Sequence, residues 1–316
     1  MTVDEAVSEI LGGKKYAGLD RSVVGRIYSE MAPKYAKYAD VVKAVKKELH
    51  IIYGSFLTKD CHAKAEMLIS NYSNAGGRAL YAPAGTQDMY SDKDFAARLM
   101  GLHASTSERA ADADSIYRMA GSYIRPQDTL LDIGCGYNPF SLPFLPTKPK
   151  SYFAYDICMR TINLVNSYFE PLAQAAYRDC AQSLGATTGT PAAYNAQSLG
   201  ATTDAPAAYS AQFLDATTDA PAVAPAAAPS TKETVVIFMF KLFPLLEHQK
   251  KGRAFELLSS MSFRTALISF PTKSASGREK GMEAFYTDMF TRGLPKQFRI
   301  AEKAVFDNEI FYVLYT

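Results

Sequence analysis

The sequence has few cysteines and none of the pairings that cysteine-based frameworks need. Its four cysteines, Cys61, Cys135, Cys158 and Cys180, form no C-x-x-C pair and have no histidine at the spacing of a zinc ligand set. This pattern argues against a disulfide framework and against a structural metal site. We therefore expect a protein of a reducing compartment that holds no metal.

Long apolar runs are also missing. The longest covers the six residues 235–240, far short of the roughly 20 that a membrane-spanning helix needs. The first ten residues, MTVDEAVSEI, are acidic, unlike the basic start of a secretory signal. The sequence thus predicts a cytoplasmic protein that is neither secreted nor embedded in a membrane.

Residues 181–230 lack lysine and arginine altogether. They consist of three copies of a 15-residue unit, AQSLGATTGTPAAYN, AQSLGATTDAPAAYS and AQFLDATTDAPAVAP, followed by AAAPS. The unit is rich in Ala, Thr and Pro and has few large apolar side chains, so it buries too little surface to offset its ordering entropy. We expect a disordered insertion in a loop. The alternative, a regular solenoid, would need an apolar face on which the units could stack.

Positive charge is concentrated near the N-terminus. Residues 11–47 carry nine lysines and arginines against three acidic residues. Such a basic segment is typical of proteins that bind a polyanion. A solvated helical face with no partner would have the same composition.

The apolar periodicity divides the chain into two regions. Residues 2–125 have apolar positions at three- and four-residue intervals, which predicts an all-helical region. The rest alternates strands and helices, which is typical of an α/β fold with a doubly wound, mostly parallel sheet; the last two strands read as an antiparallel hairpin joined through DNE. The predicted strands are 129–133, 151–156, 173–179, 234–240, 263–270, 296–306 and 309–316, and the predicted helices are 158–170 and 279–291.

A glycine-rich turn, GCGYNP, follows the first predicted strand directly. Gly134 and Gly136 allow positive φ and a close approach of a ligand to the backbone. No third glycine opens a helix, so the dinucleotide fingerprint is not met. Asp156 ends the second predicted strand, where it can accept hydrogen bonds from ribose hydroxyls, and Asp179 ends the third, where it can accept from an adenine amino group. Together these residues predict an adenosine-containing ligand.

Several segments resemble the aminoglycoside-resistance 16S rRNA methyltransferases that modify guanine N7 in the decoding A site. The resemblance runs from KKYAGL at residue 14 to the C-terminus, excluding the repeat, and the block from SFPT to GME is specific to that family. The matching segments are HASTSER (103–109), LLDIGCGYNPFSLP (130–143), YFAYDI (152–157), YRD (177–179), FKLFPLLEHQ (240–249), SFPTKSASGREKGMEAFY (269–286) and EIFYVLYT (309–316).

The resemblance implies a class I, Rossmann-like methyltransferase fold that binds S-adenosyl-L-methionine. It places Gly134 and Gly136 against the cofactor, Arg109 on the methionine carboxylate, Asp156 on the ribose and Asp179 beside the adenine. His103 of the same HASTSER segment is assigned to the cofactor site as an ordered structural residue.

The resemblance also implies a ribosomal partner, the 16S rRNA within the 30S subunit. The N-terminal helical region would dock on it through basic residues, and the strand ends would contact the guanine. The docking residues are Lys14, Lys15 and Arg21, and the candidate substrate contacts are Lys241, Ser269, Lys273, Arg278 and Glu283. Lys273 stands where most relatives have arginine, and a lysine loses the fork of donors that a planar or bidentate contact needs.

The residues after the fourth predicted strand limit which atom is methylated. Enzymes that methylate exocyclic amines use Asn or Asp followed by Pro-Pro and an aromatic residue, whereas this chain has FKLFP. Carbon methylation of pyrimidines needs a cysteine nucleophile near this point, and residues 181–316 contain no cysteine. A ring nitrogen such as guanine N7 already owns a lone pair, so positioning suffices without a general base.

The sequence therefore predicts a monomeric enzyme with two regions. Residues 1–125 form a helical region that docks on the ribosome, and residues 126–316 form the methyltransferase domain, interrupted by the insertion at 181–230. Two alternatives stay open: a methyltransferase of the same fold acting on another RNA or a small molecule, and a catalytically inactive RNA-binding relative.

Overall fold

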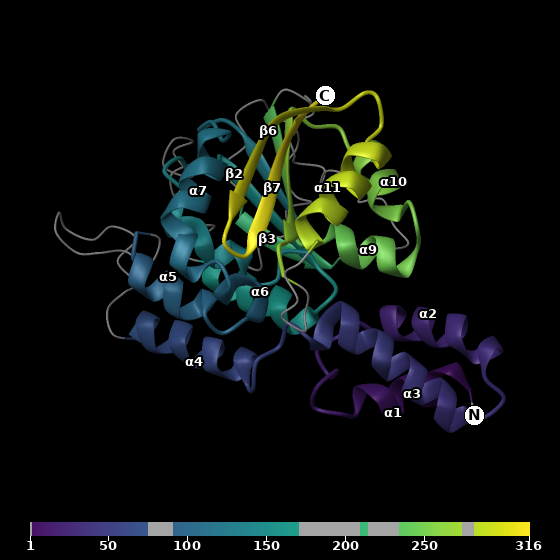
Figure 1. The fold of residues 1–316 in the computed structure, drawn as a ribbon. Coiled ribbons are helices and arrows are strands. Elements are labelled where there is room, and N and C mark those ends of the chain that lie inside the picture. Colours follow the sequence, from purple (N-terminus) through teal and green to yellow (C-terminus); the bar gives the residue numbers. More distant parts are fainter. Residues whose placement is uncertain (1, 75–90, 171–208, 214–233, 274–280) are drawn as a thin grey trace, which may run out of the picture.

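The computed structural model describes residues 2–74, 91–170, 209–213, 234–273 and 281–316 (Figure 1). In this part of the chain, the strands form a seven-stranded sheet in the order β3-β2-β1-β4-β5-β7-β6. The first five strands pair in parallel, and β6 and β7 form the antiparallel hairpin that the sequence predicted. The strands are β1 Thr129–Ile133, β2 Ser151–Asp156, β3 Tyr209–Phe213, β4 Val235–Phe240, β5 Thr265–Pro271, β6 Arg299–Phe306 and β7 Glu309–Tyr315.

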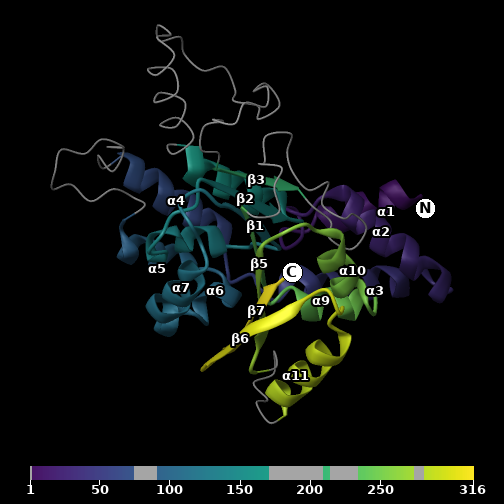
Figure 2. The same cartoon turned by 90° about the horizontal axis from the view of Figure 1, so that it is seen from above.

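Helices cover both faces of the sheet, because the central strands are apolar on both sides. Alternate residues of β1 show this: Leu130 belongs to the core on one face and Leu131 to the core on the other. Figures 1 and 2 show α4, α5 and α7 on one side of the sheet and α9, α10 and α11 on the opposite side. The first face carries α4 Cys61–Asn74, α5 Lys93–Met100, α6 Ala104–Ser107, α7 Ala113–Ser122, the 3₁₀ segments Ala110–Asp112 and Asn138–Phe144, and a helix over 159–170; the second carries α9 Phe243–Gln249, α10 Arg253–Ser260 and α11 Met282–Gly293.

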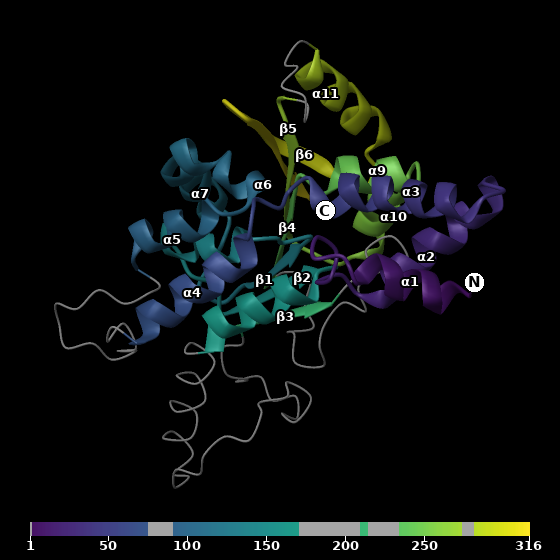
Figure 3. The same ribbon diagram turned by 90° about the horizontal axis from the view of Figure 1, so that it is seen from below.

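The N-terminal helices form a separate bundle with its own core. Thr2 and Glu5 form a capping box at the first helix, and Asp20 caps the second, as expected for residues that satisfy exposed N–H groups. The bundle packs around a core that includes Val24, Ile27 and Val45, and it lies beside α9 (Figure 3). Its elements are α1 Val3–Leu11, α2 Arg21–Met31, the 3₁₀ turn Ala32–Lys34, α3 Tyr38–Leu49 and the π-helical turn His50–Gly54.

The helices between residues 61 and 122 pack against a different core from that of this bundle. Their apolar residues, such as Phe95, Leu99 and Tyr117, belong to the same hydrophobic core as the sheet residues Leu130 and Phe238. The helical half that the sequence set apart as residues 1–125 is thus packed in two ways. Only the part up to about residue 54 has a core largely of its own.

The third strand is the main departure from the predicted fold. It was expected at 173–179, which lies outside the described residues, but the strand that pairs with β2 is Tyr209–Phe213, inside the repeat. The expectation that the whole repeat is disordered is therefore wrong for these five residues. The reason is visible in the sequence, where AAYRDCAQS, AAYNAQS and AAYSAQF are near-copies, so local pattern cannot tell which one enters the sheet.

Among the described helices, none is both long and apolar enough to cross a membrane.

Candidate cofactor and substrate pocket

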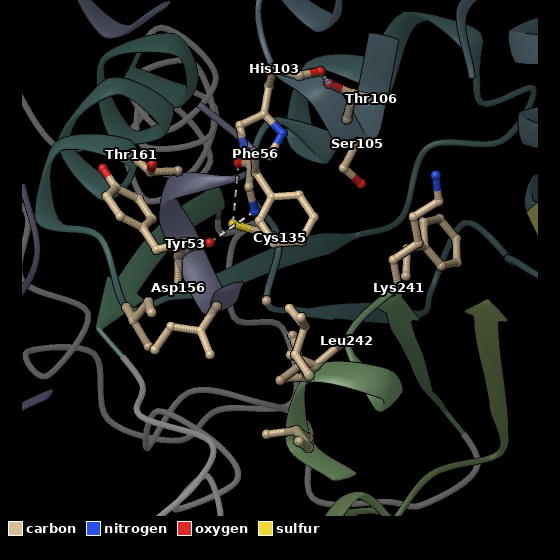
Figure 4. Close-up of a pocket in the computed structure, with 18 of the residues that line it drawn as sticks. Tyr53, Phe56, His103, Ser105, Thr106, Cys135, Asp156, Thr161, Lys241 and Leu242 are labelled. Carbon is tan, nitrogen blue, oxygen red and sulfur yellow. Dashed lines mark hydrogen bonds between the residues drawn. The ribbon is translucent and has the colours of Figure 1, made fainter. Parts of the chain in front are cut away.

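A cavity lies at the carboxyl ends of β1, β2 and β4 (Figure 4). This is the edge where ligands bind in open α/β sheets. The turn after β1 and the end of β2 form one part of its wall, and the segment Lys241–Gln249 with its apolar leucines forms another. The N-terminal bundle supplies part of the wall, through Arg26, Ile52 and Tyr53.

The turn after β1 has the backbone that its glycines predict. Gly134 has φ 68° and Gly136 has φ 49°, a region that favours glycine. A Cβ at Gly134 would lie 2.9 Å from Leu242 Cδ1, and one at Gly136 would lie 3.1 Å from His103 Cε1. The space beside both glycines is therefore filled by the chain's own side chains, so packing explains them in addition to any ligand.

Asp156 lies where the sequence placed it, at the end of β2 and in the cavity wall. Its Oδ2 accepts a hydrogen bond from Gly136 N at 2.9 Å, and its Oδ1 accepts one from Cys158 N at 2.8 Å. Burial raises the pKa of Asp156, while the backbone N–H donors act in the opposite direction. Each carboxylate oxygen keeps capacity for a further hydrogen bond.

His103 is a buried wall residue held between two aromatic rings. Its ring lies 6.0 Å from that of Phe56 and 5.0 Å from that of Tyr137, stacked on both. Burial lowers the pKa of His103 to about 3, so the imidazole is neutral at physiological pH. Within the described part of the chain, its Nδ1 has no hydrogen-bond partner.

Arg109 lines the cavity but is already bound to a carboxylate. Its Nε and Nη2 donate to the two oxygens of Glu309 at 2.7 and 2.9 Å, and Nη1 donates to Asn138 Oδ1 at 3.3 Å. Both charged side chains are 1% exposed. Burial by itself would raise the pKa of Glu309, but Arg109 and Lys241 outweigh it and lower that pKa. A ligand carboxylate at Arg109 would therefore have to share the guanidinium with Glu309 or displace Glu309 from it.

Lys241 and Ser269, two of the predicted substrate contacts, lie in the same buried network. Lys241 Nζ binds Glu108 and lies 3.5 Å from Glu309 Oε2, and the Ser269 hydroxyl donates to Glu309. Lys241 has φ 56° although it is not glycine, and its backbone N donates to Ser269 O at 3.1 Å. Such strained backbone is typical of functional sites and needs firm support from its surroundings.

Of the predicted substrate contacts that the structure describes, Lys241 lines the cavity, whereas Ser269, Lys273 and Glu283 do not. Lys273 is exposed after β5, and Glu283 pairs with Lys303 at 2.8 Å on the surface of α11. Arg278 lies outside the described residues, as does Asp179, which was expected beside the adenine.

The predicted docking residues all lie on the N-terminal bundle. Lys14 and Lys15 are exposed after α1, and Lys15 Nζ lies 3.0 Å from His50 Nδ1. Arg21 donates to Ser8 Oγ at 3.2 Å from the start of α2. These contacts leave the cations on the outer surface, where they can meet phosphate.

No pattern in the sequence indicated that the bundle also contributes to the cavity. Arg26, Ile52 and Tyr53 line it, yet in the sequence they are ordinary residues of amphipathic helices. No spacing pattern identifies them, because they reach the cavity through tertiary packing of the bundle against the sheet edge. Among the described residues, no group of three His, Cys, Asp or Glu side chains could hold a metal ion.

Comparison with known families decides what kind of protein has this cavity. A family model described as "Ribosomal RNA methyltransferase (FmrO)" matches residues 13–193 and 187–313. The chain belongs to this family. A 16S rRNA (guanine(1405)-N(7))-methyltransferase of Serratia marcescens is 29% identical over 314 residues, covering 99% of this chain and 98% of the relative. One of Proteus mirabilis with the same description is 25% identical, covering 99% and 96%.

Solved structures agree with this family. The crystal structure of the 16S rRNA methyltransferase RmtF in complex with S-adenosyl-L-homocysteine has a TM-score of 0.72 at 26% identity, covering 99% of this chain and 97% of that one. An rRNA methylase from Escherichia coli has a TM-score of 0.67 at 25% identity and full coverage of both chains. The predicted methyltransferase fold and family are thus confirmed.

Proposed function

We propose that this protein transfers a methyl group from S-adenosyl-L-methionine to N7 of a guanine in the decoding A site of 16S rRNA, and that this modification confers aminoglycoside resistance. The observation that carries the proposal is the cavity at the carboxyl ends of β1, β2 and β4, with Asp156 in its wall, in a chain that matches the rRNA methyltransferase family almost throughout.

The residues of this cavity fit an adenosyl cofactor. Asp156 is fixed by two backbone donors and retains acceptor capacity for ribose hydroxyls, and Gly134 and Gly136 line the cavity without side chains of their own. When bound, S-adenosyl-L-methionine supplies an electrophilic methyl group on a sulfonium. The neutral His103 adds no further positive charge to a site that already contains Arg109 and Lys241 and receives this cation.

The side of the cavity next to β4 suits the guanine. Phe240 and Leu242 offer apolar faces, and between them Lys241 is the candidate for substrate contact. Ser269 supports the backbone of Lys241 rather than facing a substrate directly. Guanine N7 carries its own lone pair, so these residues have to hold it in line with the methyl group and exclude water.

The N-terminal bundle is the proposed docking surface for the 30S subunit. We narrow this surface from residues 1–125 to the bundle that ends near residue 54, because helices α4 to α7 are built into the core of the sheet domain. Lys14, Lys15 and Arg21 are its proposed phosphate contacts. A monomer acting in the cytoplasm on assembled subunits completes the proposal.

The direct test uses purified protein, 30S subunits and labelled S-adenosyl-L-methionine. We expect one methyl group per subunit, mapped by primer extension and mass analysis to N7 of a single guanine of 16S rRNA. Free 16S rRNA, other RNAs and small molecules serve as competing substrates. Labelling of one of these in place of 30S subunits would support the alternative substrate, and cofactor binding without any transfer would support an inactive RNA-binding relative.

A further inference from the structure

Tyr53 connects the N-terminal bundle to the segment that follows β2. It belongs to the π-helical turn at the end of α3, and its hydroxyl lies 3.0 Å from Cys158 Sγ. Cys158 is fully buried, at 0% exposure, and it is packed in the core of the bundle although it belongs to the sheet domain. The two parts of the molecule therefore meet at this contact.

Cys158 in turn holds the acid of the cofactor cavity. Its backbone N donates to Asp156 Oδ1 at 2.8 Å. Its Sγ also accepts a hydrogen bond from Thr161 N at 3.5 Å, and Thr161 lines the cavity. The position of the Asp156 carboxylate thus depends on where Cys158 is held.

A second contact fixes the same segment through the backbone. Leu19 and Cys158 form an isolated antiparallel bridge, in which Met159 N donates to Gly18 O at 2.7 Å and Asp20 N donates to Ile157 O at 3.3 Å. A Cβ at Gly18 would lie 3.0 Å from Cys158 Sγ. The bundle therefore touches the backbone on both sides of Cys158, and its close approach leaves no room for a side chain at residue 18.

We propose that Tyr53 is a positioning residue for cofactor binding, which acts from the docking bundle through Cys158 on Asp156. This inference rests on the proposed function, since it takes the cavity to be the S-adenosyl site. The bundle is then part of the cofactor site as well as the surface that meets the ribosome. Removing the Tyr53 hydroxyl leaves Cys158 Sγ without its nearest polar partner and loosens the segment that carries Asp156.

The test measures binding of S-adenosyl-L-homocysteine to the full chain by calorimetry. Tyr53→Phe keeps the ring and removes only the hydroxyl, so we expect roughly a two- to tenfold weaker affinity, the range for one hydrogen bond. Tyr38→Phe is the matched control, because it removes a tyrosine hydroxyl from the same bundle. That hydroxyl donates to Glu9 at 2.5 Å on the outer surface, so we expect unchanged affinity.

Variants of Cys158 separate positioning from general stability. Cys158→Ala should weaken binding as Tyr53→Phe does, the double variant should be no weaker than Cys158→Ala, and Cys158→Ser, which keeps a polar partner, should restore most of the affinity. In turnover, Tyr53→Phe should raise KM for S-adenosyl-L-methionine while kcat and KM for 30S subunits stay near wild type.

Two results would overturn this role: equal affinity in Tyr53→Phe and Tyr38→Phe, or additive effects of Tyr53→Phe and Cys158→Ala. Failure of the proposed function would look different, since the wild-type protein itself would then not bind S-adenosyl-L-homocysteine or would not methylate 30S subunits.

Discussion

At the scale of single residues, Asp156 is the side chain on which the cofactor assignment depends most directly. Asp156→Ala should weaken S-adenosyl-L-methionine binding by roughly 1.5 to 3 kcal/mol, the range for hydrogen bonds to a charged group. Because burial raises the pKa of Asp156, wild-type affinity should also fall as pH is lowered through that raised pKa, where the acceptor becomes protonated. Calorimetry as a function of pH checks both effects. Unchanged affinity in the variant would show that Asp156 does not bind the cofactor.

Asp132 in β1 gives a prediction about stability rather than binding. Burial raises its pKa from 3.8 to about 6, against hydrogen bonds from Asn138 and Tyr152. An acid whose pKa is higher in the folded state contributes stability below its unfolded pKa and loses it as pH rises through the folded value. Asp132→Asn can still accept both hydrogen bonds. Its free energy of unfolding should therefore rise relative to that of wild type between about pH 4 and 6, by on the order of 2 to 3 kcal/mol. Denaturant unfolding at several pH values measures the difference, and a pH-independent difference would contradict the shift.

At the scale of elements, the buried pair of Arg109 and Glu309 joins the segment after α6 to the start of β7. Glu309→Gln would leave the guanidinium buried without its counter-charge, which costs about 3 to 5 kcal/mol of folding free energy. Glu283→Gln is the matched control, because it breaks the exposed pair with Lys303 between α11 and β6 and should cost less than about 1 kcal/mol. Denaturant titration checks both. Equal losses of folding free energy would show that the buried pair stabilises the fold no more than the exposed pair does.

How far the elements could be predicted from the sequence depends on how local their signals are. The strands β1, β2, β4, β5 and the final hairpin were predicted because each has a contiguous apolar or alternating pattern of its own. The choice of Tyr209–Phe213 as β3 was not, since three near-copies of that segment compete for one place beside β2. In the site, Asp156 follows from strand position, whereas Glu309 contacts Arg109 across 200 residues and no local pattern predicts such a pair.

At the scale of the whole molecule, a bundle with its own core is set beside the methyltransferase sheet. If the bundle meets rRNA, reversing Lys14, Lys15 and Arg21 to Glu should weaken 30S binding and flatten its salt dependence. Each phosphate contact that is lost reduces the number of counterions released on binding. Cofactor affinity should stay at the wild-type value, since none of the three side chains lines the cavity. Filter binding across a salt series tests this, and equal 30S binding by both proteins would place the interface elsewhere.

The last prediction concerns two 15-residue deletions in the repeat, one that keeps the sequence of β3 and one that removes it. Deleting residues 196–210 joins AAYN to AQFL, which regenerates the β3 sequence with Asn in place of Ser210. The melting temperature and 30S methylation should then stay nearly unchanged, because shortening a long chain connection changes its closure entropy by less than about 1 kcal/mol. Deleting 209–223 removes the same length of chain but takes all of β3 with it, and β2 loses the five-residue ladder from Tyr209 to Phe213. That deletion should lower the melting temperature by a few degrees, since about 1 kcal/mol of lost stability shifts it by roughly 1 to 2 °C in a chain of this size. Equal melting temperatures for the two deletions would show that an earlier copy of the unit can pair with β2 in place of Tyr209–Phe213.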